Sequence, residues 1–195
     1  MANPFDQELD PGIVARARAG DMKAHAVLYR SFAGAVNGVA RRLVRSPEVA
    51  EEIVQDTFVE VIHSIAGFRG AAPVGAWIRR IAVNRSLMHL RSYWERHRTA
   101  LPDGDEVELA APAAPDAHGR LDLEIALGLL PAQARAVVWL HDVEGYTHEE
   151  IGELMGQTPS FSKSQLARGY ARLRELLEKD RKEVTPWDIR TSQRS

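Results

Sequence analysis

The sequence from Ser46 to Ile65 is SPEVAEEIVQDTFVEVIHSI. Serine followed by proline is typical of a helix start, because the hydroxyl caps a free backbone N–H group and proline suits the first helical turn. Carboxylates recur every four residues and therefore share one side of the predicted helix; they are Glu48, Glu52, Asp56 and Glu60. Apolar residues occupy the other side, so we predict an amphipathic helix with an acidic face and a buried face.

Helical spacing continues on both sides of this stretch, and no segment shows a convincing strand alternation. Asp10-Pro11 and Asp21 predict the starts of two earlier helices, and Pro73 that of a later one. Proline, alanine and acidic residues dominate from Thr99 to Gly119, as in a flexible tether. The sequence therefore predicts an all-α fold with two small helical domains at 10–98 and 121–180, a linker at 99–120 and a tail at 181–195.

Composition excludes several classes of protein. The chain has 195 residues, a formal net charge of -2 and no cysteine. Disulfides, cysteine-based zinc sites and thiol nucleophiles are therefore excluded. No apolar run approaches the roughly 20 residues that span a bilayer, and the first residues lack the pattern of a signal peptide. We expect a cytoplasmic protein without membrane insertion, whose nucleic-acid binding would depend on local basic patches.

The segment from Arg69 to Arg98 is basic and aromatic. It contains seven arginines and one acid, Glu95. Aromatic residues lie among the arginines, and the two types together can stack on unpaired bases while binding phosphates; they are Phe68, Trp77, Tyr93 and Trp94. Trp77 falls in the apolar register and is expected in the core. Asn84, Arg85 and His89 lie off that register, so they are better candidates for contact with melted DNA.

A helix-turn-helix pattern occupies the second predicted domain. Thr147 and Glu150 have the spacing of a capping box, Gly156 follows as a turn, and Thr158-Pro159 begins a long basic helix. Residues near the start of that helix would reach base edges, and its arginines would bind phosphates. We expect four large side chains of the helix to point inward: Leu166, Tyr170, Leu173 and Leu177.

An enzymatic role has little support. The sequence contains no phosphate-binding glycine loop and no serine nucleophile motif. His141 and His148 lie near Glu149 and Glu150, but their spacing does not match the helical zinc motif, which places a glutamate between histidines four residues apart. No catalytic residue, metal or cofactor is expected.

These motifs together resemble the extracytoplasmic-function (ECF) sigma factors of bacterial RNA polymerase. Ala50 to Phe58 is similar to the family's region-two helix. Phe68-Arg69-Gly70, Trp77 to Asn84 and His89-Leu90-Arg91 are similar to the part that melts and binds the −10 element. Region four is represented by Leu130-Pro131, Arg135, Glu144 to Thr147, Glu150-Ile151, Leu154 to Gly156 and Lys163-Ser164.

The resemblance implies partners and site residues. The family binds core polymerase through the β′ clamp helices and the β flap, binds promoter DNA, and is often held inactive by an anti-sigma factor. The clamp contact would use Glu48, Glu51, Glu52, Gln55 and Asp56. The −10 contact would use Arg69, Arg80, Asn84, Arg85, His89 and Arg91. The −35 contact would use Ser160, Ser162, Lys163, Ser164, Gln165, Arg168 and Arg172.

The sequence departs from the family pattern at two places. Ser160-Phe161-Ser162 stands before Lys163-Ser164 where the family has Gly-Thr-Val, and Gln165 stands where it has arginine. Val74-Gly75 replaces an aromatic and polar pair before Trp77, and we expect the glycine to loosen a loop that would hold a flipped base.

Two other classes of protein stay open at this point. A stand-alone, dimeric helix-turn-helix regulator would explain the second domain but leaves the acidic helix without a role. A protein-interaction adaptor would keep the acidic helix but would not direct transcription.

Overall fold

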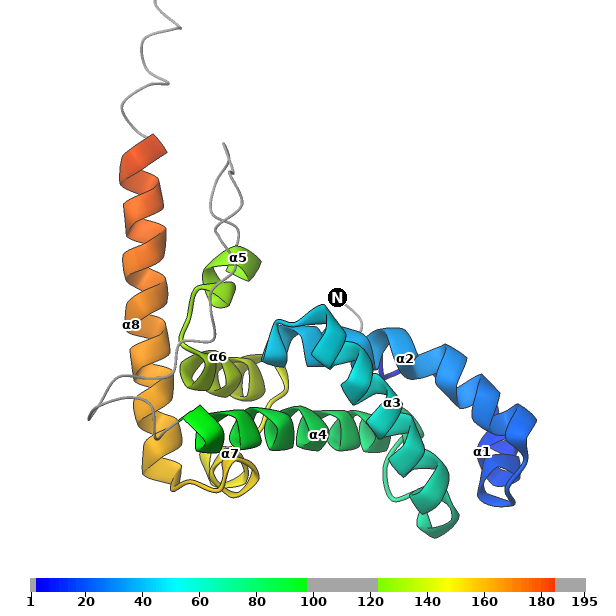
Figure 1. Ribbon diagram of the computed structural model, residues 1–195. Coiled ribbons are helices and arrows are strands. Elements are labelled where there is room, and N and C mark those ends of the chain that lie inside the picture. The colour runs from blue at the N-terminus through cyan, green and yellow to red at the C-terminus, as the bar shows by residue number, and fades with distance from the viewer. Residues whose placement is uncertain (1–2, 98–122, 185–195) are drawn as a thin grey trace, which may run out of the picture. The chain divides into compact units, whose positions relative to one another are not determined.

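The computed structural model describes residues 3–97 and 123–184, and every element in those ranges is helical, which confirms the all-α fold (Figure 1). The chain divides into two compact units, Met1–Glu95 and Arg96–Ser195. The predicted linker at 99–120 lies outside the described residues, as does Trp187 in the predicted tail.

The first unit is built around two long helices that lie side by side. Its elements are α1 (Pro11–Arg18), α2 (Met22–Val44), α3 (Pro47–Ser64), the 3-10 turn η1 (Ile65–Gly67) and α4 (Val74–His97). Short links make α2 and α3 antiparallel, and their facing sides pack together (Figure 1). No helix in the described ranges is long and apolar enough to cross a membrane.

The predicted helix starts are confirmed by their caps. Asp10 accepts from the Gly12 N–H group at 2.8 Å, Asp21 accepts from Lys23 at 2.8 Å, and Ser46 accepts from Val49 at 3.2 Å. The predicted inner face of α3 is buried as well. It is formed by Ala50, Ile53, Val54, Thr57, Phe58 and Val61. Burial of this stripe against α2 is the main stabilisation of α3, at roughly 25 cal/mol per Å² of apolar surface.

The residues before α1 complete the core of the first unit. Phe5 is 3% exposed, and its ring stacks on Phe32 of α2 with centroids 6.3 Å apart. A tight turn holds it in place, because the Phe5 N–H group donates to Asn3 Oδ1 at 3.1 Å and Asp6 N–H donates to the Asn3 carbonyl at 2.9 Å. A segment of no regular structure is thereby anchored on α2.

Gly75 corrects an expectation from the sequence. It lies in the first turn of α4 and is buried, so it does not loosen a loop. A Cβ at this position would lie 2.0 Å from the Phe5 carbonyl oxygen and 2.9 Å from Phe32 Cε1. Glycine is required because the backbone of the Phe5 segment occupies the space of a side chain.

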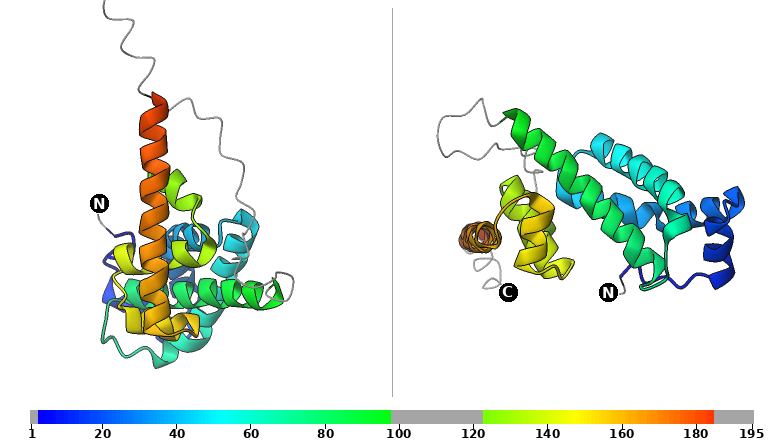
Figure 2. Two further views of the ribbon diagram at one scale, coloured as in Figure 1. Left: turned by 90° about the vertical axis from the view of Figure 1, so that its left-hand side faces the viewer. Right: turned by 90° about the horizontal axis from the view of Figure 1, so that it is seen from below.

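The second unit contains the helix-turn-helix. Its elements are α5 (Leu123–Gly128), α6 (Ala132–Val138), the π-helical turn η3 (Trp139–Val143), α7 (His148–Met155) and α8 (Pro159–Val184). Both bonds of the predicted capping box at Thr147 and Glu150 are present, and Gly156 ends α7 with φ 65°. Helices α6 and α7 both pack on α8, which continues as one long helix (Figure 2).

Only part of α8 is buried. Leu166 is 9% exposed, as predicted, whereas Tyr170 is 43% exposed and Leu177 is 38% exposed, so the prediction that these two point inward was wrong. The phenol of Tyr170 instead donates to Asp142 Oδ1 at 2.8 Å. This hydrogen bond raises the pKa of Tyr170 because the carboxylate favours the protonated phenol.

We expect Tyr170 to ionise above the ordinary tyrosine pKa of about 10. A raised pKa in the folded state means that the bond contributes stability below pH 10 and loses that contribution as pH rises through the folded-state value. The absorbance of wild type and of Tyr170→Phe is measured as a function of pH. Subtracting the second titration curve from the first isolates the ionisation of the Tyr170 phenol. Asp142→Asn is expected to move its transition to lower pH, and an unchanged transition would contradict the assignment.

Candidate functional site

The acidic face of α3 is exposed to solvent at Glu48, Glu52 and Asp56, whereas Glu60 at its end is half-buried. The carboxylates and the amide that the family resemblance assigns to polymerase binding are all exposed: Glu48, Glu51, Glu52, Gln55 and Asp56. The Ser46 hydroxyl donates to Glu48 Oε2 at 2.7 Å and lowers the pKa of Glu48, together with a backbone hydrogen bond. Glu48 therefore stays charged near neutral pH, and the face presents a dense negative patch to a partner.

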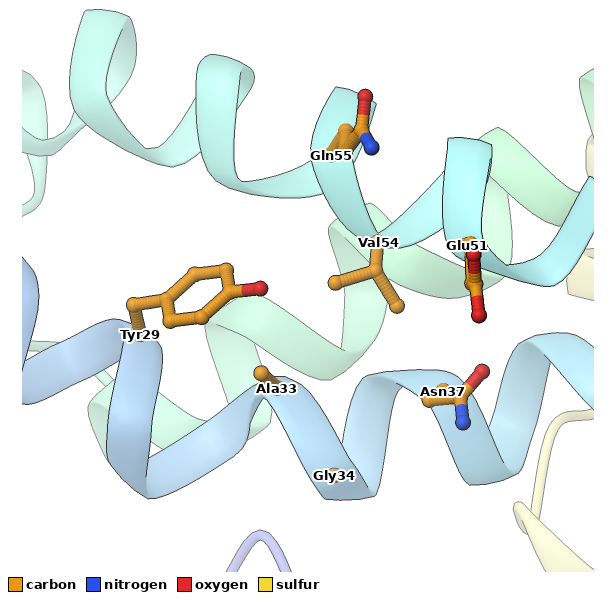
Figure 3. Close-up of a pocket in the computed structure, with 7 residues that line it drawn as sticks. All are labelled: Tyr29, Ala33, Gly34, Asn37, Glu51, Val54 and Gln55. Carbon is orange, nitrogen blue, oxygen red and sulfur yellow. The ribbon is translucent and has the colours of Figure 1, made fainter.

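The structure adds a feature that the sequence did not reveal. A groove of about 370 Å³ lies between α2 and α3, next to the acidic face (Figure 3). Its α2 side is lined by Tyr29, Ala33, Gly34 and Asn37. No distinct signal in the sequence marked this groove, because small residues recur along the whole of α2.

Helix α4 brings part of the predicted −10 set onto one side. Arg80, Asn84 and Arg91 are separated by four and seven residues, so they lie along one helical face. Arg80 and Arg91 are exposed and Asn84 is half-buried, with its Oδ1 atom buried and without a hydrogen-bond partner. Trp77 is half-buried rather than enclosed in the core, and its ring lies 5.1 Å from that of Phe68, next to exposed Arg69.

The other two predicted −10 residues lie on a different side of α4. Arg85 and His89 are half-buried and are one turn apart. The Arg85 guanidinium donates to Glu60 Oε2 of α3 at 2.8 Å. This ion pair links α3 to α4 and is worth about 0.2–1 kcal/mol, because both side chains are partly exposed. The geometry brings together Arg80, Asn84 and Arg91, but it does not bring Arg85 and His89 to the same face.

The start of α8 presents a polar and basic surface. Ser160, Lys163, Ser164 and Arg168 are exposed there. The Thr158 hydroxyl accepts from the Phe161 N–H group at 3.2 Å and so fixes the first turn. One turn beyond Arg168, Arg172 pairs with Glu175 at 3.0 Å on the surface of the helix.

Ser162 and Gln165 are not on this surface, so the prediction that they contact the −35 element was wrong. Ser162 is 0% exposed and Gln165 is 3% exposed. The Ser162 hydroxyl forms a 3.0 Å hydrogen bond with His148 Nδ1 of α7, and the Gln165 amide donates to Gln133 Oε1 of α6 at 3.5 Å. Both side chains hold α8 against the other helices of the unit.

We expect Ser162→Ala and Lys163→Ala to act in different ways. Ser162→Ala removes a buried hydrogen bond and should lower the free energy of unfolding of this unit by about 1 kcal/mol. It should leave the DNA sequence preference unchanged. Lys163→Ala should leave the stability unchanged and weaken DNA binding, with the salt dependence reduced by roughly one phosphate contact. Thermal melts test the stability of the two variants, and DNA-binding titrations at several salt concentrations test their affinity. A changed base preference in Ser162→Ala would contradict the buried position of Ser162.

His141 and His148 of this unit have structural contacts. The rings of His141 and His148 stack with centroids 4.7 Å apart, and His141 Nδ1 lies 2.8 Å from Asp142 Oδ1. Within the described parts of the chain, no group of three or more histidine, aspartate or glutamate side chains is placed to hold a metal ion. The π-turn, the stack and the Asp142–Tyr170 bond together join η3, α7 and α8.

Comparison with known proteins matches both units. The family model for Sigma-70 region 2 matches residues 28–96, and that for Sigma-70, region 4 matches residues 120–173. The chain is 36% identical to RNA polymerase sigma factor CarQ of Myxococcus xanthus, over 83% of this chain and 94% of that protein. It is 31% identical to ECF RNA polymerase sigma factor SigM of Mycobacterium tuberculosis, over 86% and 84%.

A solved structure shows the same fold. It is the sigma factor RpoE from Bartonella quintana in complex with the anti-sigma factor NepR, with 27% identity and a TM-score of 0.50. The match covers 81% of this chain and 97% of that one.

The matches to both sigma-70 regions, in this order along two helical units, identify a transcription initiation factor. The chain belongs to the ECF sigma factor family of RNA polymerase. It is a sigma factor that directs transcription initiation, and members of this family bind core polymerase and promoter DNA.

Proposed function

We propose that this protein delivers core polymerase to promoters through three surfaces. The exposed carboxylates of α3 bind the polymerase clamp, the Arg80 side of α4 and the Arg69 loop bind the melted −10 element, and the start of α8 binds the −35 element. The observation that carries this proposal is that every carboxylate assigned to the clamp contact is exposed, while the opposite face of the same helix is buried.

Strand opening depends on the balance between the free energy needed to extrude a base and the free energy gained from contacts with the protein. Extruding a base from the duplex costs a few kcal/mol, and stacking on aromatic and arginine side chains recovers roughly 1–3 kcal/mol per base. Phosphate contacts add an electrostatic contribution that falls with salt. We propose that the protein has no catalytic site of its own, acts in the cytoplasm, and needs no metal or cofactor, so that polymerase supplies all bond formation.

An anti-sigma factor is part of the proposal. The RpoE structure from Bartonella quintana contains one, NepR, and its fold is that of this chain. By this likeness, an anti-sigma partner would cover the surfaces used for polymerase binding.

Run-off transcription tests the proposed function. Purified protein is mixed with core RNA polymerase and DNA from upstream of its own gene, and core polymerase alone serves as the control. A specific transcript that requires the protein supports the proposal. Tight binding to a palindromic duplex without polymerase, and no transcript, would identify a stand-alone regulator instead.

A further inference from the structure

The Arg69 loop, residues 68–73, joins η1 to α4 and has buried residues on both sides. Its own residues are exposed, apart from the half-buried Phe68. Ile65 of η1, before the loop, and Val74, the first residue of α4 after it, are both buried. The arrangement of the exposed part therefore depends on how η1 and the start of α4 are held.

The start of α4 is held by the Phe5 segment, residues 3–6. Gly75, in the first turn of α4, lies so close to this segment that a Cβ there would overlap the Phe5 carbonyl oxygen. The Phe5 ring stacks on Phe32, so the segment connects the start of α4 to α2. The right-hand view of Figure 2 shows the beginning of the chain beside this end of α4. Close-packed backbone of this kind transmits a displacement of one segment to the other.

The η1 end of the loop is held by α1. Helix α1 packs against both η1 and α2. His25 of α2 is buried and fixes the end of α1, because its Nε2 atom donates to the Ala17 carbonyl at 2.7 Å. Residues 3–18 thus connect both ends of the Arg69 loop to one helix, α2.

We propose that residues 3–18 position the Arg69 loop for capture of unpaired −10 bases, with Phe5 as the positioning residue at the α4 end. A loop that is already held in its binding arrangement loses less conformational freedom when it binds. If Phe5 were not docked, only a fraction of molecules would have the loop in this arrangement, and the apparent affinity for unpaired bases would fall by that fraction. This inference rests on the proposed contact of the Arg69 loop with the melted −10 element.

Phe5→Ala tests the positioning role in the full chain assembled with core RNA polymerase. Strand opening is measured by permanganate reactivity of thymines in DNA from upstream of the protein's own gene, and we expect it to fall roughly tenfold. Affinity for core polymerase and closed-complex formation on ice should match wild type, because the exposed surfaces of α3 and α8 are unchanged. Phe5→Leu keeps a buried apolar side chain and should recover most of the opening.

Leu43→Ala is the matched control for lost stability. Leu43 is fully buried in α2 and lies 43 − 32 = 11 positions beyond Phe32, or roughly 16 Å along the helix. Like Phe5→Ala, it deletes a buried apolar side chain and should lower the Tm of the unit. Only Phe5→Ala should impair strand opening. Equal losses of opening in the two variants would overturn the proposal, because opening would then depend on stability alone.

Asn3→Ala is a milder variant for the case in which Phe5→Ala does not fold. It removes the side-chain oxygen that accepts from the Phe5 N–H group at 3.1 Å and leaves the Phe5 ring in the chain. Opening should fall roughly threefold, as for the loss of one partly buried hydrogen bond. Wild-type opening in either variant, once thermal melting shows that it is folded, would overturn the positioning role.

Arg69→Ala shows whether Phe5 acts through the loop, and it separates this proposal from the proposed function. If Phe5 positions the loop, Phe5→Ala combined with Arg69→Ala should lose less opening than the product of the two single losses. Losses that multiply would mean that Phe5 acts elsewhere. If Arg69→Ala opens DNA normally, the proposed −10 contact of the loop fails, and the positioning role fails with it. If only Phe5→Ala opens DNA normally, the −10 contact stands and the positioning role is wrong.

Discussion

Gly75→Ala is expected to lower the free energy of unfolding of the first unit by about 2 kcal/mol, although glycine to alanine normally stabilises a helix. The added Cβ would lie 2.0 Å from the Phe5 carbonyl oxygen, which belongs to the backbone and cannot rotate away. Overpacking of this kind costs roughly 1–3 kcal/mol. Improved helix propensity offsets only about 1 kcal/mol of it at most, and less near a helix start.

The measurement is a chemical denaturation curve, supported by a fall in Tm of about 4–8 °C for each kcal/mol in a domain of this size. Gly34→Ala is the matched control, because Gly34 is an exposed helical glycine and its added Cβ would have no neighbour within 4 Å. That change should raise stability by about 0.5–1 kcal/mol.

Removing residues 1–6 identifies the cause of the Gly75 effect. The shortened chain loses the burial of Phe5 and should be less stable than wild type. In that background the additional cost of Gly75→Ala should fall below about 1 kcal/mol, because only the contact with Phe32 is left. An equal cost in both backgrounds would mean that the Phe5 segment is not what requires glycine.

Glu52→Arg with Asp56→Arg is expected to abolish run-off transcription by reversing the centre of the acidic face. Both side chains are exposed, so the domain should fold normally. Placing like charges opposite one another at an interface costs several kcal/mol, which corresponds to a loss in affinity for core polymerase of about a hundredfold or more.

The control for this charge reversal is Asp6→Arg with Glu8→Arg. These two side chains are exposed in the same unit but precede α1, so the net charge changes equally while α3 is untouched. Transcription by the control should match wild type. A similar loss in both variants would show that overall charge, rather than the α3 face, determines polymerase binding.

Local signals in the sequence predicted the helices and their starts correctly. Asp10, Asp21, Ser46 and Thr147 cap the helices that they were expected to cap, because a cap depends only on residues two or three positions away. The exposed side of α3 followed from its spacing for the same reason.

The errors arose where a residue's environment is set by a distant segment. Ser162 and Gln165 are polar, so their residue type indicated a surface, yet they occupy the buried face of α8 because His148 and Gln133 accommodate them there. Gly75 was misjudged because Phe5 comes from the opposite end of the unit. Tyr170 is exposed because Asp142 of the π-turn offers its hydroxyl a partner.

The anchoring of Phe5 on Gly75 also bears on how the unit folds. The two residues are 75 − 5 = 70 positions apart, so their contact closes a loop as long as most of the unit. Contacts of such long range tend to form after the transition state, and those that do so govern unfolding more than folding. During synthesis the Phe32 partner of Phe5 is made early, but the contact of the Phe5 segment with Gly75 can form only when α4 has emerged. We expect this contact to form late in folding and therefore to slow the unfolding of the finished domain.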